Sequence, residues 1–250
     1  MNALPVSDPK DTAFSEEQFD KLYPLGVERH YWSRCRNKVI ARTLRKVNAV
    51  GPMLEIGCGK GVVVEYLRND GFDITGIELA PVKALPSVAT FVKTGADVLD
   101  MDPAVCAKIR SILLLDVIEH IEDPIAFLAM VRKKLPNAEC VLATVPARQE
   151  LFSNFDRFNK HFRRYDLEML TDHLRTGNTS SSYVSYVFHG LYPAARLLLK
   201  SKGEREVGFN VPKNWLAELF NYVLGLFFYV EFLVLPRKWK GTSVIGVAKS

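Results

Sequence analysis

Residues 53–61, which read MLEIGCGKG, constrain the fold of this chain more than any other stretch. The first four residues predict a short buried strand, and residues 62–67 have the apolar spacing of a helix. Between them lies a turn built on Gly57, Gly59 and Gly61. A strand, a glycine turn and a helix in this order bring backbone N–H groups and a helix N-terminus up to a bound ligand. We therefore expect a ligand at this turn.

The spacing of the glycines separates the ligand classes that use such turns. A P-loop would need glycine where Leu54 stands and serine or threonine where Gly61 stands. A dinucleotide-binding turn would need glycine at the position of Val62. The chain instead has E-x-G-x-G-x-G, which begins at Glu55. Taken alone, three glycines could also form nothing more than a tight turn, so the neighbouring residues have to decide.

Composition and charge exclude several classes of protein. With 250 residues, 48% of them hydrophobic and 24% charged, the chain can bury a substantial core in one large or two small domains. The net charge of +5 is mild and scattered, so no nucleic-acid partner is expected. The four cysteines form no C-x-x-C pair, which argues against a zinc site or a disulfide framework. Free thiols, and an N-terminus without the apolar core of a signal peptide, favour a cytoplasmic location.

Strands and helices alternate along the chain, which predicts an α/β fold with a mostly parallel sheet. A capping box at Ser15 opens a first helix, and a second covers residues 28–46. Pro124 starts a helix that runs to about Lys134, and Asp166 starts another that runs to about Arg175 and ends at Gly177. The expected strands are residues 53–56, 73–78, 89–93, 111–116, 140–145, 181–188 and 242–249.

Carboxylates stand at or just after the ends of several predicted strands. Glu78 lies 17 residues beyond Gly61, close to where a doubly wound fold places an acidic group for ribose hydroxyls. It could also be a solvated residue at a strand end. Asp97 could accept from an adenine amine or could simply shape a turn. Asp116 begins the sequence D-V-I-E-H, which follows the apolar strand 111–115.

In their order and spacing these elements resemble the class I S-adenosylmethionine-dependent methyltransferases over roughly residues 50–147. The resemblance extends to a small-molecule subgroup through His30-Tyr-Trp32, Asp116-to-His120, Val145-Pro-Ala147 and His161-Phe-Arg163-Arg164-Tyr165. Two departures stand out. Lys60 replaces a small or hydroxyl residue, and Asp156 precedes the H-x-R-R-Y element in a less typical setting.

The resemblance implies a doubly wound, mostly parallel seven-stranded sheet with a Rossmann-like methyltransferase fold. Residues 1–46 would form an N-terminal helical cover, and two interpretations of it remain: it packs on the sheet, or it lines the substrate cleft. Residues 47–189 would form the cofactor-binding core, 190–241 a helical lid insertion and 242–250 the final strand, antiparallel to its neighbours. The cofactor would be S-adenosylmethionine, held by Glu55, Gly57, Cys58, Gly59, Gly61, Glu78, Asp97, Val98 and Asp116.

The resemblance also implies methyl transfer to a small-molecule or lipid- or saccharide-linked acceptor. His120 is the candidate base, because an imidazole can take a proton from a hydroxyl group, although it could instead brace its loop. His161, Arg163, Arg164 and Tyr165 could bind an anionic acceptor or tie their own loop to helix ends. Asp116, Glu119, His120 and Glu122 could hold a divalent ion, but charged turns are common and no metal is expected. A binding protein without transfer activity and a nicotinamide oxidoreductase remain as alternatives.

Residues 214–235 are the most apolar part of the chain. Asn214, Glu218, Asn221 and Gly225 fall on one face of the predicted helix. Glu218 and Glu231 leave only twelve residues between them, which argues against a membrane span. Two interpretations remain, a lid over the acceptor pocket, which we favour, and a helix on the inner membrane surface with the basic residues of 213–240 at the headgroups.

Overall fold

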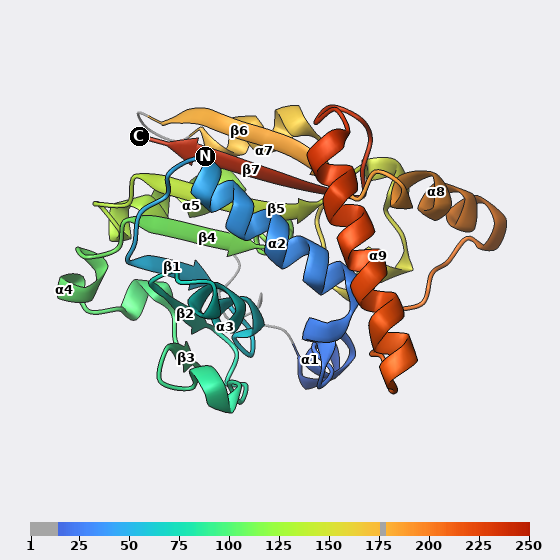
Figure 1. Ribbon diagram of the computed structural model, residues 1–250. Coiled ribbons are helices and arrows are strands. Elements are labelled where there is room, and N and C mark those ends of the chain that lie inside the picture. Colours follow the sequence, from blue (N-terminus) through green and yellow to red (C-terminus); the bar gives the residue numbers. More distant parts are fainter. Residues whose placement is uncertain (1–14, 176–178) are drawn as a thin grey trace.

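A seven-stranded sheet forms the centre of the computed structural model, which describes residues 15–175 and 179–250 (Figure 1). The strand order is β3-β2-β1-β4-β5-β7-β6. Strands β1 to β5 run parallel to one another, and β7 runs antiparallel to both β5 and β6. The strands are β1 (Met53–Ile56), β2 (Ile74–Glu78), β3 (Val92–Thr94), β4 (Ser111–Leu115), β5 (Cys140–Pro146), β6 (Ser180–Val187) and β7 (Ser243–Lys249). The predicted fold class and the antiparallel final strand are confirmed.

The strands form where the sequence predicts them, with one shift. The expected third strand, residues 89–93, begins only at Val92, because residues 86–88 form a short 3-10 turn that ends at Ala89. The central strand β4 is buried at every position, as its unbroken apolar sequence requires. Gly177, expected to end a helix, lies outside the described residues.

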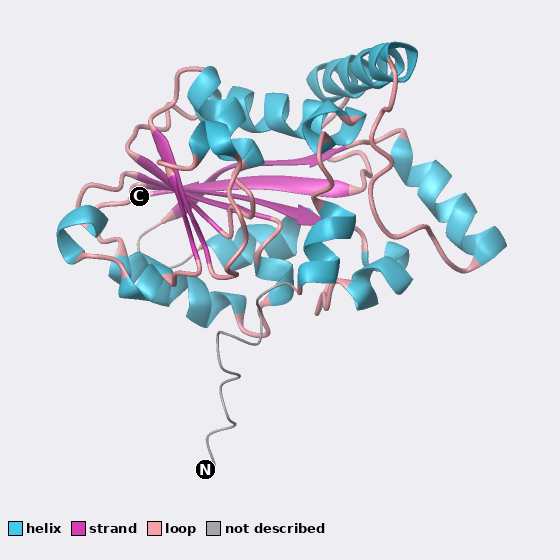
Figure 2. Cartoon of the chain, turned by 90° about the horizontal axis from the view of Figure 1, so that it is seen from below, coloured by secondary structure: helices cyan, strands magenta, loops and turns pink. Residues whose placement is uncertain are grey.

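Helices cover both faces of the sheet (Figure 2). The helices α2 (Tyr31–Lys46), α3 (Val62–Asn69) and α9 (Trp215–Val234) share one hydrophobic core with Met53 and Leu113. The helices α4 (Pro103–Cys106), α5 (Pro124–Lys134) and α7 (Leu167–Leu174) share the other core with Leu54 and Ile112. Neighbouring strand residues thus point to opposite faces, as the pleat of a strand dictates.

The N-terminal segment reaches the glycine turn. The predicted capping box at Ser15 is present and starts α1 (Glu16–Leu22). A Cβ atom on Gly59 would lie 3.6 Å from the rings of Phe19 and Tyr23, so this segment lies directly on the turn. Lys60 Nζ donates to the carbonyl of Tyr23 at 3.1 Å. The unusual lysine of this turn therefore holds the N-terminal cover in place.

The insertion before the last strand contains two helices that have different environments. The helix α8 (Leu191–Lys202) leads away from β6 and is followed by a loop without regular structure up to Asn214. The helix α9 then returns and packs along α2 (Figure 1). The chain passes from there into β7, which closes the sheet between β5 and β6.

Candidate active site

Three glycines of the turn after β1 adopt backbone conformations that other residues rarely adopt. Gly57, Gly59 and Gly61 have φ values of 75°, 55° and 87°. A Cβ on Gly57 would lie 2.8 Å from Cγ2 of Val117, and one on Gly61 would lie 2.8 Å from Cγ2 of Val92. Steric contact and φ therefore both require glycine at these two positions. Without side chains at these positions, the backbone of the turn passes close to its neighbours, and Gly59 and Gly61 are buried.

Glu78, at the end of β2, is tied to this turn. Its carboxylate accepts hydrogen bonds from the N–H of Gly59 at 2.8 Å and of Ala80 at 2.9 Å. Burial raises the pKa of Glu78, while these backbone hydrogen bonds act in the opposite direction. Each oxygen keeps a further lone pair, so the carboxylate is oriented by the fold and can still accept from a pair of hydroxyls.

Glu55 presents a buried carboxyl group beside the turn. Its side chain is 2% exposed, and no described group donates to its Oε2. Burial raises its pKa to about 8, although the charge of Arg36 opposes the shift. A buried carboxyl oxygen without a partner is costly unless a ligand group satisfies it. The ammonium group of an amino acid would do so.

The other predicted cofactor residues lie at neighbouring strand ends. Asp116 follows β4 directly, has a φ of 58°, and forms a 2.6 Å ion pair with Arg36. Asp97 Oδ1 accepts from Leu99 N at 2.9 Å, so one of its oxygens already shapes a turn, and Val98 beside it is buried. Cys58 is buried, and a Cβ on Gly76 would lie 2.6 Å from its Sγ. The fold therefore gathers all of these residues at the carboxyl edge of the sheet, while their contacts with a cofactor stay predictions.

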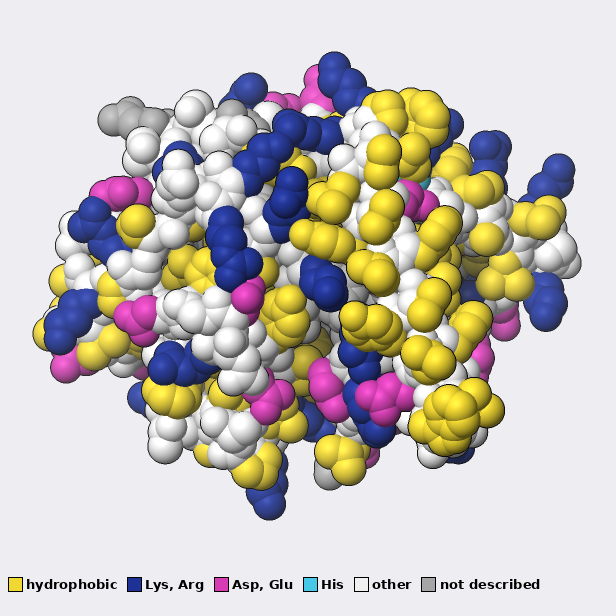
Figure 3. All heavy atoms as spheres, in the orientation of Figure 1, with side chains coloured by type: hydrophobic (Ala, Val, Ile, Leu, Met, Phe, Trp, Pro, Cys, Tyr) yellow, Lys and Arg dark blue, Asp and Glu magenta, His cyan; other side chains and the backbone are white. Residues whose placement is uncertain are grey.

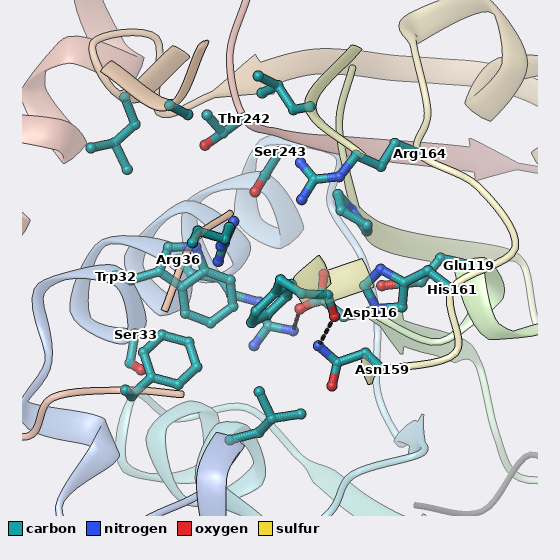
Figure 4. A pocket seen from close by; sticks show the side chains of 18 of the residues that line it. Trp32, Ser33, Arg36, Asp116, Glu119, Asn159, His161, Arg164, Thr242 and Ser243 are labelled. Atoms are coloured by element: carbon teal, nitrogen blue, oxygen red, sulfur yellow. Dashed lines mark hydrogen bonds and ion pairs between the residues drawn. The ribbon is translucent and has the colours of Figure 1, made fainter. Parts of the chain in front are cut away.

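A cavity of about 420 Å³ opens beside Asp116 (Figure 4). One end is polar and is lined by Arg36, Asp116, Glu119, His120, His161 and Arg164. The apolar part of the lining includes Trp32, which lies under Arg36, Phe155, which lies against His161, and Phe209. The α8 residues Leu191, Leu198 and Leu199 add further apolar lining. The cavity therefore suits a molecule with a polar head and an apolar body.

The cover of this cavity differs from the one we expected. Residues of α2, including Trp32 and Ser33, line it, as one of the two interpretations of the N-terminal segment required. From the insertion, α8, Arg205 and Phe209 line it, but none of the described residues of α9 does. The favoured lid role for residues 214–235 is therefore wrong, because α9 packs on α2 and leaves the cover to α8 and the loop after it.

Glu119, His120 and His161 form a buried group at the polar end. One ligand atom from each lies within 4.8 Å of the other two, and the two imidazole rings stand edge to face at 4.6 Å. Burial, followed by the charge of Asp116, raises the pKa of Glu119 well above its usual value, and no described group donates to either of its oxygens. Burial and the charge of His161 lower the pKa of His120 to about 3, so its imidazole is neutral near pH 7.

This group differs from the acidic cluster considered in the sequence. Glu122 is exposed and lies outside it, whereas His161, which is 41 residues beyond His120 in the chain, joins it. The donor set of one carboxylate and two imidazoles could hold a divalent metal ion. It could equally share a proton, because its members are close and buried.

The H-x-R-R-Y element contributes two of its residues to the cavity. Asp156 is fully buried and binds both His161 Nδ1 at 2.9 Å and Arg164 Nε at 2.8 Å. Burial would raise the pKa of Asp156, but the His161 hydrogen bond and the Arg164 charge outweigh it and lower that pKa. Arg163 instead donates to the carbonyl of Glu122, and Tyr165 is fully buried with its hydroxyl on the carbonyl of Ile118. Arg163 and Tyr165 therefore hold their own loop in place, which was the alternative to binding an acceptor.

Several residues of the site were not expected from the sequence. Arg36 lies one helical turn after Trp32, and its guanidinium stacks over that ring at 4.9 Å and pairs with Asp116. That i, i+4 spacing was a signal that could have been used. Arg205 and Phe209 come from a loop without regular structure, so no pattern could have placed them in the cavity.

Comparison with known proteins places this geometry in a family. A family model described as a methyltransferase domain matches residues 28–178. A protein named ubiquinone biosynthesis O-methyltransferase, from Caulobacter sp. (strain K31), is 28% identical over 164 residues, which is 55% of this chain and 63% of that protein. The match thus spans less than two thirds of that relative's length.

Solved structures share the fold. The methyltransferase domain of bacterial CtHen1-C superposes with a TM-score of 0.52 at 12% identity, covering 86% of this chain and 97% of that one. The plantazolicin methyltransferase BamL, solved with a triazolic desmethylPZN analog and SAH, gives 0.51 at 16% identity, covering 94% and 88%.

The residues present fit the cofactor of this family. Beside the glycine turn, Glu55 offers a buried carboxyl oxygen without a described donor, and Glu78 is oriented to accept from hydroxyls. A nicotinamide oxidoreductase, which the sequence had left open, is set aside by the family match. The chain belongs to the methyltransferase-domain family.

Proposed function

We propose that this enzyme methylates a hydroxyl oxygen on a small molecule with an apolar body, in a form that can be lipid-linked. The cavity carries this proposal, because titratable side chains such as Asp116 and His120 line it together with apolar side chains from α2, α8 and the loop after α8. The curated relatives named ubiquinone biosynthesis O-methyltransferase support oxygen as the methylated atom. A saccharide-linked acceptor fits less well, since sugars would leave the apolar wall without complementary contacts.

The chain's own residues would position the two reactants. S-adenosylmethionine supplies a methyl group on a positively charged sulfur, which is already a good leaving group. Glu55 would hold the ammonium group, Glu78 the ribose hydroxyls, and Asp97 with Val98 the adenine. Positioning and exclusion of water then account for most of the rate, because effective molarities from orientation reach about 10⁵ M or more.

The acceptor hydroxyl has to lose a proton as its oxygen attacks. His120 stands at the polar end of the cavity and is neutral near pH 7, so it can accept that proton. A pKa of about 3 makes it a weak base by itself. Glu119 and His161 lie close enough to share the proton with His120. Together the three groups form a stronger base than any one of them.

Arg205 suggests that the acceptor carries a second polar substituent. Its guanidinium stacks over the ring of Phe155 at 3.9 Å and forms no ion pair with a described carboxylate. Burial, together with the charge of Arg164, lowers the pKa of Arg205 to about 10. A carboxylate, phosphate or ionised phenol on the acceptor would offset the cost of keeping this charge in the cavity wall.

The proposed location follows from the acceptor. An enzyme of the cytoplasm that takes an apolar acceptor has to collect it from the inner membrane surface. A membrane contact through residues 214–240 would bring the cavity close to that source.

The experiment uses the full chain and S-adenosylmethionine with a deuterated methyl group, incubated with a total lipid extract and, separately, with a water-soluble extract. Mass spectrometry should find a labelled product in the lipid extract, with the label on oxygen. The Glu78→Ala variant, impaired in cofactor binding, is the negative control. Label on nitrogen or carbon, or only in the water-soluble extract, would overturn the proposed acceptor class. Cofactor binding without turnover in any extract would support the binding protein without activity.

A further inference from the structure

The outer face of α9 is apolar along its whole length. Eleven of its twenty residues are large apolar side chains exposed to solvent, and Figure 3 shows them as a continuous column. They range from Leu226, 40% exposed, to Trp215, 72% exposed. This outer face consists of Trp215, Leu216, Leu219, Phe220, Tyr222, Val223, Leu226, Phe227, Val230, Leu233 and Val234. A soluble protein rarely exposes so large an apolar surface unless something binds it.

The inner face of α9 is fixed to the body of the protein. Glu218 pairs with Arg34 at 3.0 Å and with Arg29 at 3.5 Å. Asn221 Oδ1 accepts from the N–H of Tyr31 at 3.0 Å. A Cβ on Gly225 would lie 3.1 Å from the carbonyl oxygen of Tyr31, so the two helices touch here through their backbones. The predicted single polar face of this helix is thus the one that meets α2.

The second carboxylate of α9 is also turned inward. Glu231 is buried and accepts from the N–H of His189 at 2.6 Å and of Gly190 at 2.7 Å. With Phe228 and Phe232 buried beside it, the helix cannot rotate to bury its outer face without breaking these bonds. Since both acidic residues are engaged on the inner side, the outer face carries no charge.

By length and composition alone α9 could cross a bilayer. The inner face rules out such a span for the folded chain, because a spanning helix would have to part from α2 and expose Glu218 and Glu231 to lipid. The helix α9 turns its polar side to the protein and its apolar side outward. This is the arrangement expected of a helix that lies in the plane of a membrane surface.

Basic residues border the outer face. Lys213 precedes α9, and Arg237, Lys238 and Lys240 follow it, together with the half-exposed indole of Trp239. Figure 3 shows a second column of basic side chains, over α2, beside the apolar one. Arg42 and Lys46 belong to α2, and burial together with the charges of Arg237 and Arg42 lowers the pKa of Lys46. Within the described part of the chain none of these six cations forms an ion pair, so no carboxylate neutralises their charges. Lys46 and Arg237 lie over the ring of Tyr183, and Lys240 lies over that of Tyr192.

Charge decides which partner fits. A second copy of the chain, packed face to face on α9, would bring these basic residues against their own copies. An anionic membrane surface offers apolar depth for the outer face and negative headgroups for its border. Trp239 adds an indole of the kind that favours the membrane–water interface.

We propose that the outer face of α9 lies in the headgroup region of an anionic lipid bilayer, with Lys213, Arg42, Lys46, Arg237, Lys238 and Lys240 on the headgroups. The helix α8 presents apolar side chains both to the cavity and to solvent, since Leu198 lines the cavity and is 37% exposed, while the adjacent Leu197 is 69% exposed. An apolar molecule could therefore pass between bilayer and cavity along α8. The membrane contact itself does not depend on the identity of the acceptor.

The test is flotation of the full chain with vesicles of phosphatidylcholine alone and of phosphatidylcholine mixed with phosphatidylglycerol. We expect the wild-type chain to float with the anionic vesicles and to be released by salt. The variant Leu219→Ser/Phe220→Ser/Phe227→Ser should bind roughly tenfold or more weakly, because it loses three apolar side chains that would enter the bilayer. The variant Arg42→Gln/Lys46→Gln/Arg237→Gln should lose binding by a similar factor at low salt and show a weaker salt dependence, because only three of the six cations remain. Phe228 and Phe232 are left alone, because they belong to the core.

A matched control replaces exposed apolar residues on other helices, Val105→Ser/Ile125→Ser, and should bind as the wild type does. Circular dichroism and cofactor affinity verify that each variant is folded. The absence of binding at every lipid composition, or equal loss in the control, would overturn the proposal. So would a dimer in light scattering that the α9 variant dissolves, which would make a second copy the occupant. Because binding is read without turnover, its failure is distinct from failure of the proposed reaction.

Discussion

The buried carboxylate of Asp156 fixes the imidazole of His161, whose Nδ1 lies 2.9 Å from Oδ1. If Nδ1 carries the hydrogen, Nε2 of His161 is an acceptor directed away from Asp156. That arrangement sets the tautomer of a ring that lies against His120 in the cavity. A residue outside the cavity lining thus determines the chemistry available inside it.

Replacing this carboxylate should be costly. Asp156→Asn keeps the shape of the side chain but leaves the Arg164 guanidinium, 3% exposed, without its counter-charge. We expect the free energy of unfolding to fall by roughly 3–5 kcal/mol, as for a buried pair that loses one partner. Urea denaturation measures this. In the double variant Asp156→Asn/Arg164→Met much of the loss should return, because no buried charge remains; equal losses in both would contradict this account.

The hydrogen bond from Gly59 to Glu78 predicts two effects of one substitution. Glu78→Ala should weaken binding of S-adenosylmethionine by roughly 1.5–3 kcal/mol, since charge-assisted hydrogen bonds to the ribose are lost. It should also loosen the turn, because Gly59 and Ala80 lose an acceptor. Calorimetry gives the affinity and urea midpoints give the stability. Glu78→Gln keeps one acceptor oxygen, so its cofactor affinity and its stability should lie between those of the wild type and of Glu78→Ala. Unchanged affinity in Glu78→Ala would falsify this assignment.

Glu55 should make cofactor binding depend on pH. In the empty protein its pKa is about 8, so near pH 6 the carboxyl is protonated and has to release its proton to pair with an ammonium group. Affinity should therefore rise with pH, by up to about tenfold per unit, and level off near pH 8, where a free amino group begins to lose its own proton. Calorimetry in buffers of different ionisation enthalpy counts the released proton. A slope that persists in Glu55→Gln would assign the effect to another group.

The same group affects stability in the opposite sense. The ordinary pKa of 4.5 applies to the unfolded chain and the value of about 8 to the folded one. Between these values the unfolded chain ionises Glu55 and the folded chain does not, so the free energy of unfolding should fall as pH rises through this window. Thermal denaturation of the empty protein should show a smaller pH dependence in Glu55→Gln than in the wild type.

His120 is expected to act on the acceptor and not on the cofactor. His120→Ala should slow turnover by about 10²-fold or more, the scale of a lost general base, with little change in cofactor affinity. Because its pKa is about 3, no loss of rate between pH 5 and 8 should come from protonation of His120 itself. Saturated turnover that survives while cofactor affinity collapses would make the residue structural. His120→Gln tests whether a neutral hydrogen-bonding group is enough.

Local patterns predicted most of the sheet. The apolar run of β4, the glycine turn after β1 and the capping box at Ser15 are properties of neighbouring residues, so the sequence shows them directly. Glu55 and Glu78 could be assigned to the turn because strand ends in a parallel sheet share one edge. The shift of β3 to Val92 came from a turn whose residues carry no strong signal.

The cavity could not be predicted in the same way. It joins Arg36 on α2, His161 after α6 (Asn154–Phe158) and Arg205 after α8, and no periodicity relates segments so far apart. The H-x-R-R-Y element shows why, since its four named residues look equivalent in the sequence. In the structure Asp156 binds His161 and Arg164, which line the cavity. Arg163 and Tyr165 instead bind backbone carbonyls and hold the loop in place.

The sequence by itself determined the α/β fold, the glycine turn with its two carboxylates, and which face of residues 214–235 is polar. Only the tertiary structure decided that this polar face meets α2, that α8 covers the cavity instead of α9, and that eleven apolar side chains stay outside. The physical reason is that helical periodicity defines two faces of a helix but not their neighbours. Those neighbours depend on packing and on pairs such as Glu218 with Arg34, which exist only once distant segments meet.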